Sequence, residues 1–318
     1  MVYAIASALL PILFVVGLGY LAAYLAIIPS KAAGTLAAFV VNFALPLSLF
    51  LAAAKAKPSD LANWRYLLAL AAGIIGTFIL GIALSRFVFK RNWREAAIQG
   101  QSCSFPNMAY CGPPVLGAVV GPTGILAVLI GNLITSLITI PTTLVMLKAG
   151  EAPAKGAGPA PSVVRVIGGS LWGAAKAPLV WLPVAGVIVA FSGFQLPGLL
   201  VSMTNEIGSA SGGVALFTLG LMLERMTFKL DREVVVNTAI KNLVQPAVCL
   251  GAGFVLGLSG ALEKEVFLLA VLPSATLIPS LAHNSGVYET DSSLTAMAST
   301  LFSIATISAA IAIAEALP

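Results

Sequence analysis

Two short segments concentrate the polar side chains of a chain that is otherwise strongly apolar. The first reads GQSCSFPNMAYCGPPVLGAVVG from Gly100 to Gly121, and the second reads AVLPSATLIPSLAHNSGVYETD from Ala270 to Asp291. Asn107 offers two amide donors and one acceptor, and further hydroxyl groups come from Ser104, Tyr110, Ser274 and Thr276. These groups form hydrogen bonds, and no arginine lies deep in either segment. We expect them to hold a small carboxylate through amides, hydroxyls and helix dipoles.

Prolines interrupt both segments. Proline removes a backbone donor and clashes with the preceding turn of a helix. Pro106, Pro113 and Pro114 therefore predict a break in the first helix, and Pro273 and Pro279 predict a break in the second. A broken helix presents free N–H groups at its N-terminus, which attract anions. Two breaks in corresponding places indicate a transport site. The alternative is a pair of proline kinks with no ligand.

The composition places the chain in a membrane. Of its 318 residues, 59% are hydrophobic and only 9% are charged, whereas soluble chains carry about a quarter charged residues. Basic residues lie in short clusters between apolar runs and form no face with interleaved aromatics, so nucleic-acid binding is not expected. The three cysteines and one histidine lack metal-ligand spacing, so we expect no metal and no cofactor.

Ten apolar segments are long enough to span a bilayer as helices, which need about 20 residues. They are Tyr3–Ile28, Ala33–Ala54, Trp64–Phe89, Glu95–Val120, Pro122–Leu147, Ala174–Gln195, Asn205–Met226, Val234–Ser259, Lys264–Val287 and Ser292–Ala316. The predicted fold class is therefore an all-α integral membrane protein.

A stretch rich in Pro, Gly and Ala, residues 148–162, predicts a linker between residues 1–147 and residues 163–318. Five spans on each side would make the halves inverted repeats. A constant shift places Pro11 on Pro183, Gly81 on Gly253 and Ser102 on Ser274. Most of the 17 Lys and Arg residues, with Lys241 among them, then fall on one face. The positive-inside rule puts that face and the linker in the cytoplasm and both termini outside.

The chain resembles the auxin efflux carrier family, which includes plant auxin carriers and bacterial malonate-carrier-like proteins. The resemblance covers nearly the whole chain. It is carried by FVVNFALPLSLF (Phe39–Phe50), FPNMAYCGPPVLG (Phe105–Gly117), GVALFTLGLML (Gly213–Leu223), IKNLVQPAVCL (Ile240–Leu250) and LPSATLIPSLA (Leu272–Ala282).

This resemblance implies ten helices in two inverted repeats, with the fourth and ninth crossing at prolines that we place at Pro114 and Pro279. It also implies a transport domain that moves against a scaffold domain in an elevator-like step, often in a homodimer. The family's substrate-binding asparagine matches Asn107. Two features depart from plant members: the long central domain is replaced by the linker, and no acidic residue lies between Trp64 and Leu70.

Three further polar residues are candidates. Asn42 lies inside a span, where it lines a cavity or bonds to a neighbouring helix. Histidine is the side chain whose unperturbed pKa lies near neutrality, so His283, with Gln101, is a candidate for coupling transport to a proton or sodium. The alternative for His283 is a polar residue at the cytoplasmic end of its helix.

The sequence thus predicts a secondary transporter, not an enzyme, that moves a small organic anion such as malonate or an auxin-like acid across a bacterial inner membrane. Alternatives are a polytopic membrane enzyme, or a channel or sensor without coupled transport. A serine protease is disfavoured because SASG at Ser209–Gly212 is a faint match and there is one histidine. A channel is disfavoured because nothing resembles a selectivity filter.

Overall fold

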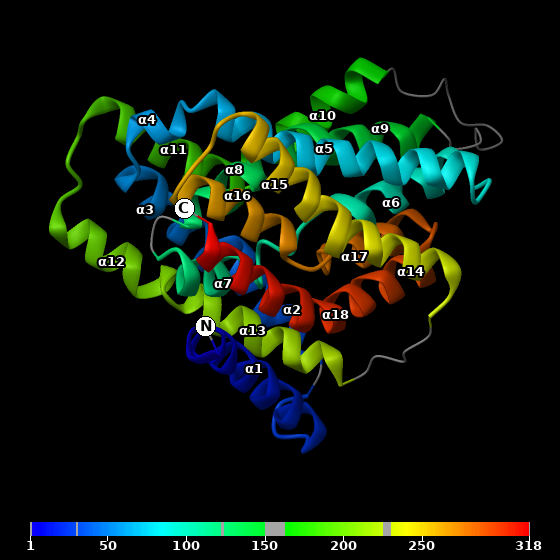
Figure 1. Cartoon of the computed structure of the whole chain (residues 1–318), viewed down its shortest axis with the longest axis horizontal. Coiled ribbons are helices and arrows are strands. Elements are labelled where there is room, and N and C mark those ends of the chain that lie inside the picture. Colours follow the sequence, from blue (N-terminus) through cyan, green and yellow to red (C-terminus); the bar gives the residue numbers. More distant parts are fainter. Residues whose placement is uncertain (1, 30, 122–123, 150–162, 225–229, 318) are drawn as a thin grey trace.

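The computed structural model describes residues 2–29, 31–121, 124–149, 163–224 and 230–317. Within these ranges the chain is helical and has no β-strand; an isolated bridge joins Pro106 and Ser274 (Figure 1). Six helices are long and apolar enough to cross a membrane, or up to seven if one bent helix pair is a single span. The prediction of an all-α, multi-pass membrane protein is confirmed at this level.

Each of the six long helices overlaps a span predicted from the sequence. Two of them are single α-helices, α5 (Trp64–Phe87) and α18 (Glu289–Ala316), and a third consists of α12 (Gly198–Gly208) and α13 (Ala210–Leu223), separated by Ser209. The other three contain a π-helical segment between two α-helices: α2, η1 and α3 (Ala32–Phe39, Val40–Ala44, Leu45–Lys55); α8, η3 and α9 (Ile125–Ile134, Thr135–Thr139, Ile140–Ala149); and α14, η4 and α15 (Arg232–Ala239, Ile240–Val244, Gln245–Val255).

Shorter helices occupy the other four predicted spans. They are α1 (Val2–Tyr24), α6 and α7 (Trp93–Ser104 and Gly112–Val119), α11 (Pro178–Ser192), and α16 and α17 (Ala261–Val271 and Leu277–Ser285). Two more helices lie between spans, α4 (Pro58–Leu61) and α10 (Val163–Lys176). Of the predicted linker, Lys148 and Ala149 belong to α9, and residues 150–162 lie outside the described residues.

Each π-helical segment is followed, two residues after its end, by a proline. Pro46 follows η1, Pro141 follows η3 and Pro246 follows η4. A proline ring clashes with the carbonyl four residues earlier, so the chain adopts a wider turn there. The wider turn is visible in the bonds, because the amide N–H of Leu45 donates to Val40 and that of Gln245 donates to Ile240, both five residues back.

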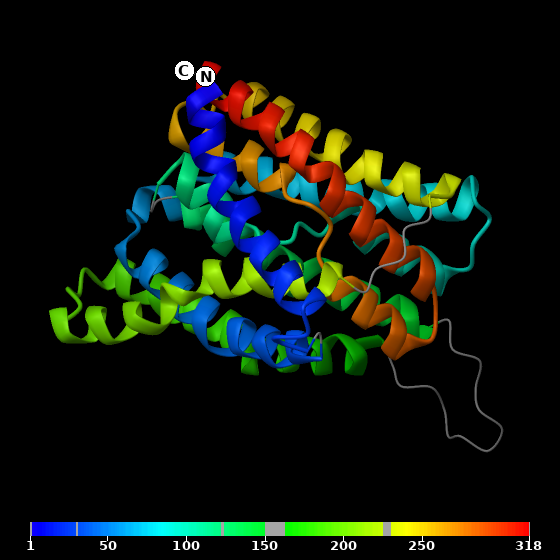
Figure 2. The ribbon, with the colours of Figure 1, turned by 90° about the horizontal axis from the view of Figure 1, so that it is seen from below.

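The helices pack in two groups, each drawn from both halves of the chain. In the first bundle, α3 packs on α11 and α12, and α13 packs on α1 and α2. In the second bundle, α5 packs on α6 and α15, and α18 packs on α14, α16 and α17. Figure 2 shows the yellow and red helices of the second bundle along one side, the lighter blue and light green helices of the first bundle along the other, and the dark blue helix α1 running across between the two sides. The bundles meet along a seam where α3 contacts α8 and α7 contacts α1 and α13.

Glycines allow the closest approach inside the first bundle. A Cβ atom at Gly19 of α1 would lie 2.1 Å from the carbonyl oxygen of Phe217, and one at Gly220 of α13 would lie 2.1 Å from that of Val16. Small residues at such crossings bring membrane helices into backbone contact. No larger side chain fits at either position without moving a helix.

An ion-pair cluster ties together three elements of the second bundle. Arg91, between α5 and α6, lies 3.0 Å from Glu233 on α14 and 3.3 Å from both Glu95 on α6 and Asp291 on α18. Burial lowers the pKa of Arg91, but the hydrogen bond and charge of Glu233, with the charges of Glu95 and Asp291, outweigh it and raise the pKa above its ordinary value. The guanidinium therefore stays charged and holds the three helix ends together.

Candidate functional site

The two irregular segments pair with each other at the centre of the second bundle. The first lies between the end of α6 at Ser104 and the start of α7 at Gly112, and the second lies between α16 and α17. The amide N–H of Asn107 donates to the carbonyl of Pro273 at 2.7 Å, and that of Ala275 donates to the carbonyl of Phe105 at 2.9 Å. These two bonds satisfy backbone groups that lack helical partners. We call this pairing the crossing.

The prolines at the crossing are Pro106 and Pro273, so the prediction that placed it at Pro114 and Pro279 is wrong. The reason is that proline is accepted in the first turn of a helix, where no intrahelical donor is required. Pro114 lies in the first turn of α7 and Pro279 lies in the first turn of α17. These prolines start helices, whereas Pro106 and Pro273 occupy extended chain.

Side chains satisfy the last carbonyl groups of α6 and α16. The Ser274 hydroxyl donates to the carbonyl of Ser102 at 2.9 Å, and the amide of Gln245 donates to that of Ser104 at 2.6 Å. The Lys241 amine donates to the carbonyl of Ala270 at 2.8 Å and also to that of Leu272. Helix ends buried in a bilayer need such partners. The crossing is thus braced by side chains from η4 and α15.

Lys241 therefore does not belong to the basic face, and this part of the sequence interpretation is wrong. The residue lies in η4, its side chain is completely buried, and both of its bonds reach into the core of the second bundle. Counting basic residues by loop assumes that a charge near a span end reaches water. Lys241 is the tenth residue of the span Arg232–Val255, where charged side chains are rare.

A cavity of about 380 Å³ lies against the crossing, at the seam between the bundles. Four of the predicted site residues line it, Asn42, Asn107, Tyr110 and Thr276. Its volume is in the range of sites for small molecules, about 300–1,000 Å³. We call it the crossing cavity.

Asn107 is the central polar group of the crossing cavity. Its side chain is 1% exposed, and its amide nitrogen has no hydrogen-bond partner among the described residues. A buried donor without a partner costs about 1–3 kcal/mol, so a ligand that accepts its hydrogen bond gains this energy back. Beside it, the side chain of Thr276 is a hydrogen-bond partner of the Tyr110 hydroxyl.

Two helices begin at the wall of the crossing cavity. The residues preceding α7 and α17, among them Tyr110 and Thr276, line it, as does Leu277, the first residue of α17. Because helix N-termini carry partial positive charge, both helix starts favour a negatively charged ligand. Asn42 reaches the same cavity from η1 of the first bundle and donates to the carbonyl of Ala38.

The other predicted site residues lie elsewhere. Ser104 and Ser274 take part in the crossing but do not line the cavity, and Pro114 faces a separate pocket beside α13. Gln101 is fully buried, where its amide donates to Thr143 at 2.9 Å and holds α6 against α9. His283 is 79% exposed and lies 2.7 Å from Glu289, away from the cavity.

A second cavity, of about 620 Å³, lies next to the crossing cavity. The two share Phe105, Asn132, Leu179 and Leu277, and the second reaches Lys148 at the end of α9 and Arg165 on α10. Both basic side chains are exposed. A basic mouth raises the local concentration of anions.

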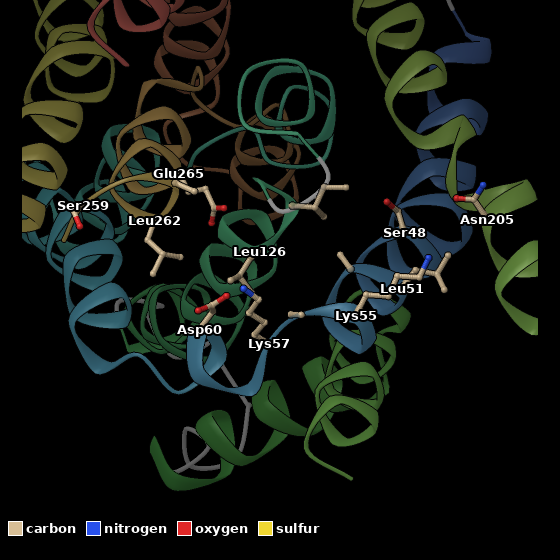
Figure 3. Close-up of a pocket in the computed structure, with 14 residues that line it drawn as sticks. Ser48, Leu51, Lys55, Lys57, Asp60, Leu126, Asn205, Ser259, Leu262 and Glu265 are labelled. Atoms are coloured by element: carbon tan, nitrogen blue, oxygen red, sulfur yellow. The ribbon is translucent and has the colours of Figure 1, made fainter. Parts of the chain in front are cut away.

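A third cavity, of about 530 Å³, lies along the same seam and shares no lining residue with the crossing cavity. Figure 3 shows Lys57, which precedes α4, and Asp60 of α4 on one side of this cavity, and the buried carboxylate of Glu265 of α16 turned toward the space between. The Tyr66 hydroxyl donates to Glu265 at 2.6 Å. Along α8 and α9 the cavities follow one another in chain order, from Ile125 to Lys148.

Sequence reasoning missed three polar residues of the second bundle: Lys241, Gln245 and Glu265. Lys241 is a charge within an apolar span, a signal that was present in the sequence. Glu265 follows Glu263 and Lys264 near the start of α16, a pattern typical of a charged helix end. Gln245 gave no comparable signal, because an amide inside a span often bonds to a neighbouring helix without functional meaning.

Paired helix breaks beside a cavity that contains a few polar groups, inside an apolar helical chain, are features of membrane transporters. A family model described as "Membrane transport protein" matches residues 4–311. The chain therefore belongs to this family, the auxin efflux carrier family that its motifs resemble. The family and the relatives below are transporters and not enzymes.

Two relatives cover most of the chain. It is 30% identical over 285 residues to a protein of Escherichia coli (strain K12) named "Uncharacterized transporter YfdV", a match that covers 88% of each chain. It is 28% identical over 309 residues to a protein of Rhizobium meliloti (strain 1021) named "Putative malonate transporter", a match that covers 95% of this chain and 93% of that protein.

Proposed function

We propose that this transporter carries a small organic anion, with malonate as the first candidate, and binds it in the crossing cavity. The observation that carries this proposal is the buried amide nitrogen of Asn107, which faces the cavity without a partner among the described residues. The two helix starts and the basic mouth favour an anion. The malonate candidate comes from the name of the Rhizobium meliloti relative.

Alternating access by an elevator-type movement accounts for the arrangement of bundles and cavities. The first bundle would be the scaffold domain and the second, which contains the crossing, the transport domain. In support, the three cavities lie along one seam, and the crossing cavity shares lining residues with the second cavity but none with the third. A shift of the second bundle along this seam would expose Asn107 to the other side.

A ten-span inverted repeat fits this scheme. Each bundle draws helices from both halves of the chain, and the start of α1 and the end of α18 lie at the same end of the molecule (Figure 2), as an even number of spans requires. With the positive-inside rule, the basic mouth at Lys148 and Arg165 would face the cytoplasm of a bacterial inner membrane and both termini would lie outside. The homodimer and a coupling role for Gln101 or His283 stay predictions.

The first test is thermal stabilisation of detergent-purified protein by malonate. A ligand that binds only the folded state stabilises it by about 2.7 kcal/mol at 100 times its Kd. We expect malonate to raise the melting temperature of the wild type, and we expect the rise to be lost in Asn107→Ala. The matched control is Asn205→Ala, which removes an exposed amide from α12, outside the crossing cavity.

Three outcomes separate the parts of the proposal. If malonate stabilises Asn107→Ala as strongly as the wild type, the site is wrong. If malonate has no effect but indole-3-acetate stabilises the wild type and not Asn107→Ala, the site stands and the substrate class moves to auxin-like acids. If neither anion stabilises the wild type or is taken up by proteoliposomes, the proposal of an organic-anion carrier is wrong.

A further inference from the structure

Lys241 is a lysine buried completely inside the second bundle. Its amine donates to the carbonyls of Ala270 and Leu272, which end α16 at the crossing. Moving an ammonium ion out of water costs several kcal/mol unless an opposite charge compensates it. Two carbonyl dipoles at a helix C-terminus supply part of that compensation.

No described carboxylate forms an ion pair with Lys241. The titratable groups that face it are thiols, namely Cys103 of α6, Cys111 before α7 and Cys249 of α15. The nearest carboxylate of α16 in sequence is Glu265, which bonds to Tyr66 and lies five residues before Ala270, about 7.5 Å along the helix axis. The acidic residues of α14 and α18 lie at helix ends: Glu233 and Asp291 are in first turns and pair with Arg91, and Glu315 is in the last turn of α18.

The environment of Lys241 suits both protonation states of its amine. A neutral amine has two N–H groups, which match the two carbonyl acceptors, and a charged amine adds one more donor. The bonding geometry therefore does not fix the charge. A nearby anion would favour the charged form, and removal of that anion would favour the neutral one.

A short route connects Lys241 to the crossing cavity. The amine binds the carbonyl of Leu272, the next residue is Pro273, and the carbonyl of Pro273 accepts the amide N–H of Asn107. One backbone segment thus has Lys241 on one side and the proposed anion-binding residue on the other. An anion at Asn107 would lie close enough to act on the charge of Lys241 through a low-dielectric layer.

We propose that Lys241 binds a proton when an anion enters the crossing cavity and releases it when the anion leaves, so that a proton travels with the anion. The proton comes from water on the side from which the anion enters, is held on the lone pair of the Lys241 amine, and returns to water on the other side. The buried charge is then offset in the loaded carrier and absent in the empty one. This inference rests on the proposed function and adds the coupling ion to it.

The first experiment measures malonate affinity against pH from 6.5 to 8.5, a range above the titration of carboxylic acids. With one linked proton, the Kd of the wild type rises with pH, approaching about tenfold per pH unit at the alkaline end. Lys241→Arg carries a permanent charge, so its Kd should stay flat. Lys241→Met should bind malonate more weakly with no pH dependence. Lys176→Met, which removes an exposed lysine of α10, should follow the wild type.

The second experiment follows proton movement in proteoliposomes with a pH dye inside and a malonate gradient across the membrane. Malonate uptake by the wild type should acidify the interior, and uptake by Lys241→Arg should not. Wild-type uptake without acidification, or Lys241→Arg with the same acidification and pH dependence as the wild type, would overturn the role of Lys241 and leave the proposed function in place. Absence of any anion uptake by the wild type would overturn the proposed function itself, and the coupling with it.

Discussion

Replacing Gly73 by alanine would place a methyl group against Cys249, at the contact between α5 and α15 behind the crossing. A Cβ atom at Gly73 would lie 2.1 Å from the Cys249 sulfur but 3.5 Å from the Cys249 Cβ. The first distance is a severe overlap and the second is ordinary van der Waals contact. Cys249 is 1% exposed, so its sulfur has little room to move. The overlap therefore depends on a single atom.

The two substitutions should rescue each other. Gly73→Ala alone is expected to cost about 1–3 kcal/mol, the usual range for overpacking a core. Cys249→Ala alone removes the sulfur and should cost about 1 kcal/mol. In the double variant the new methyl group occupies the space of the lost sulfur, so adding Gly73→Ala to Cys249→Ala should cost little. The expected coupling between the two sites is about 1–3 kcal/mol.

The assay is a double-mutant cycle on detergent-purified protein, read as apparent melting temperatures of the wild type, both single variants and the double variant. We expect Gly73→Ala to be the least stable of the four. A matched control is Gly76→Ala on the same helix, where a Cβ atom meets no atom within 4 Å. If Gly73→Ala lowered the melting temperature equally in the wild type and in Cys249→Ala, the packing argument would be refuted.

Three further predictions follow from other contacts. Gln245→Leu removes the hydrogen-bond donor to the carbonyl of Ser104 at the end of α6. The free energy of unfolding, measured by chemical denaturation, should fall by about 1–3 kcal/mol. If the variant were as stable as the wild type, Gln245 would not brace the crossing. Pro46→Ala should let η1 return to a regular α-helix and turn Asn42 away from the crossing cavity. We expect weaker malonate binding with little change in melting temperature. If malonate binding were unchanged, Asn42 would not belong to the site. Arg91→Met removes the cation that pairs with three carboxylates. The melting temperature should fall most at low salt, and it should recover as salt screens the carboxylates or as acid protonates them. If the fall in melting temperature did not depend on salt or pH, the packing of the Arg91 side chain, not its charge, would stabilise the cluster.

Periodicity and length were sufficient to locate the long helices. Continuous apolar runs such as Trp64–Phe87 contain no proline or cap within the span, so their helical state follows from hydropathy alone. Their ends were less predictable because they depend on local backbone geometry. For example, α1 ends at Tyr24 instead of Ile28, where Ala26 has a positive φ of 55°.

Composition did not reveal which prolines interrupt a helix and which begin one. Pro113 and Pro114 lie within two residues of the start of α7 and begin that helix, whereas Pro106 lies in the extended chain before it. The sequence alone does not show where the extended chain ends and the helix begins. The π-helical segments were likewise not predicted. A proline inside a long apolar run predicts a helix kink, and the sequence does not show whether the helix accommodates the displaced carbonyl by a wider turn.

Four of the candidate site residues lie together in the structure, and their role in binding stays a prediction. Asn107, Tyr110, Thr276 and Asn42 were identified from residue type and position, and the structure brings all four to one cavity. Lys241 was placed on the wrong face and Gln245 was not a candidate, because the bonds that matter join them to backbone carbonyls of helices distant in sequence. Such partners have no side-chain signature, and they appear only when the chain is folded.

The three π-helical segments also have a consequence for the history of the family. A wider turn holds one more residue than a regular turn, so each segment is equivalent to a single-residue insertion absorbed without a loop. It rotates the following part of the helix by about 100° relative to an uninterrupted helix. Relatives that lack Pro46, Pro141 or Pro246 would then be expected to lack one residue just upstream. A one-residue gap in an alignment at these places would indicate that a π-helical segment was gained or lost while the packing of both helix ends stayed the same.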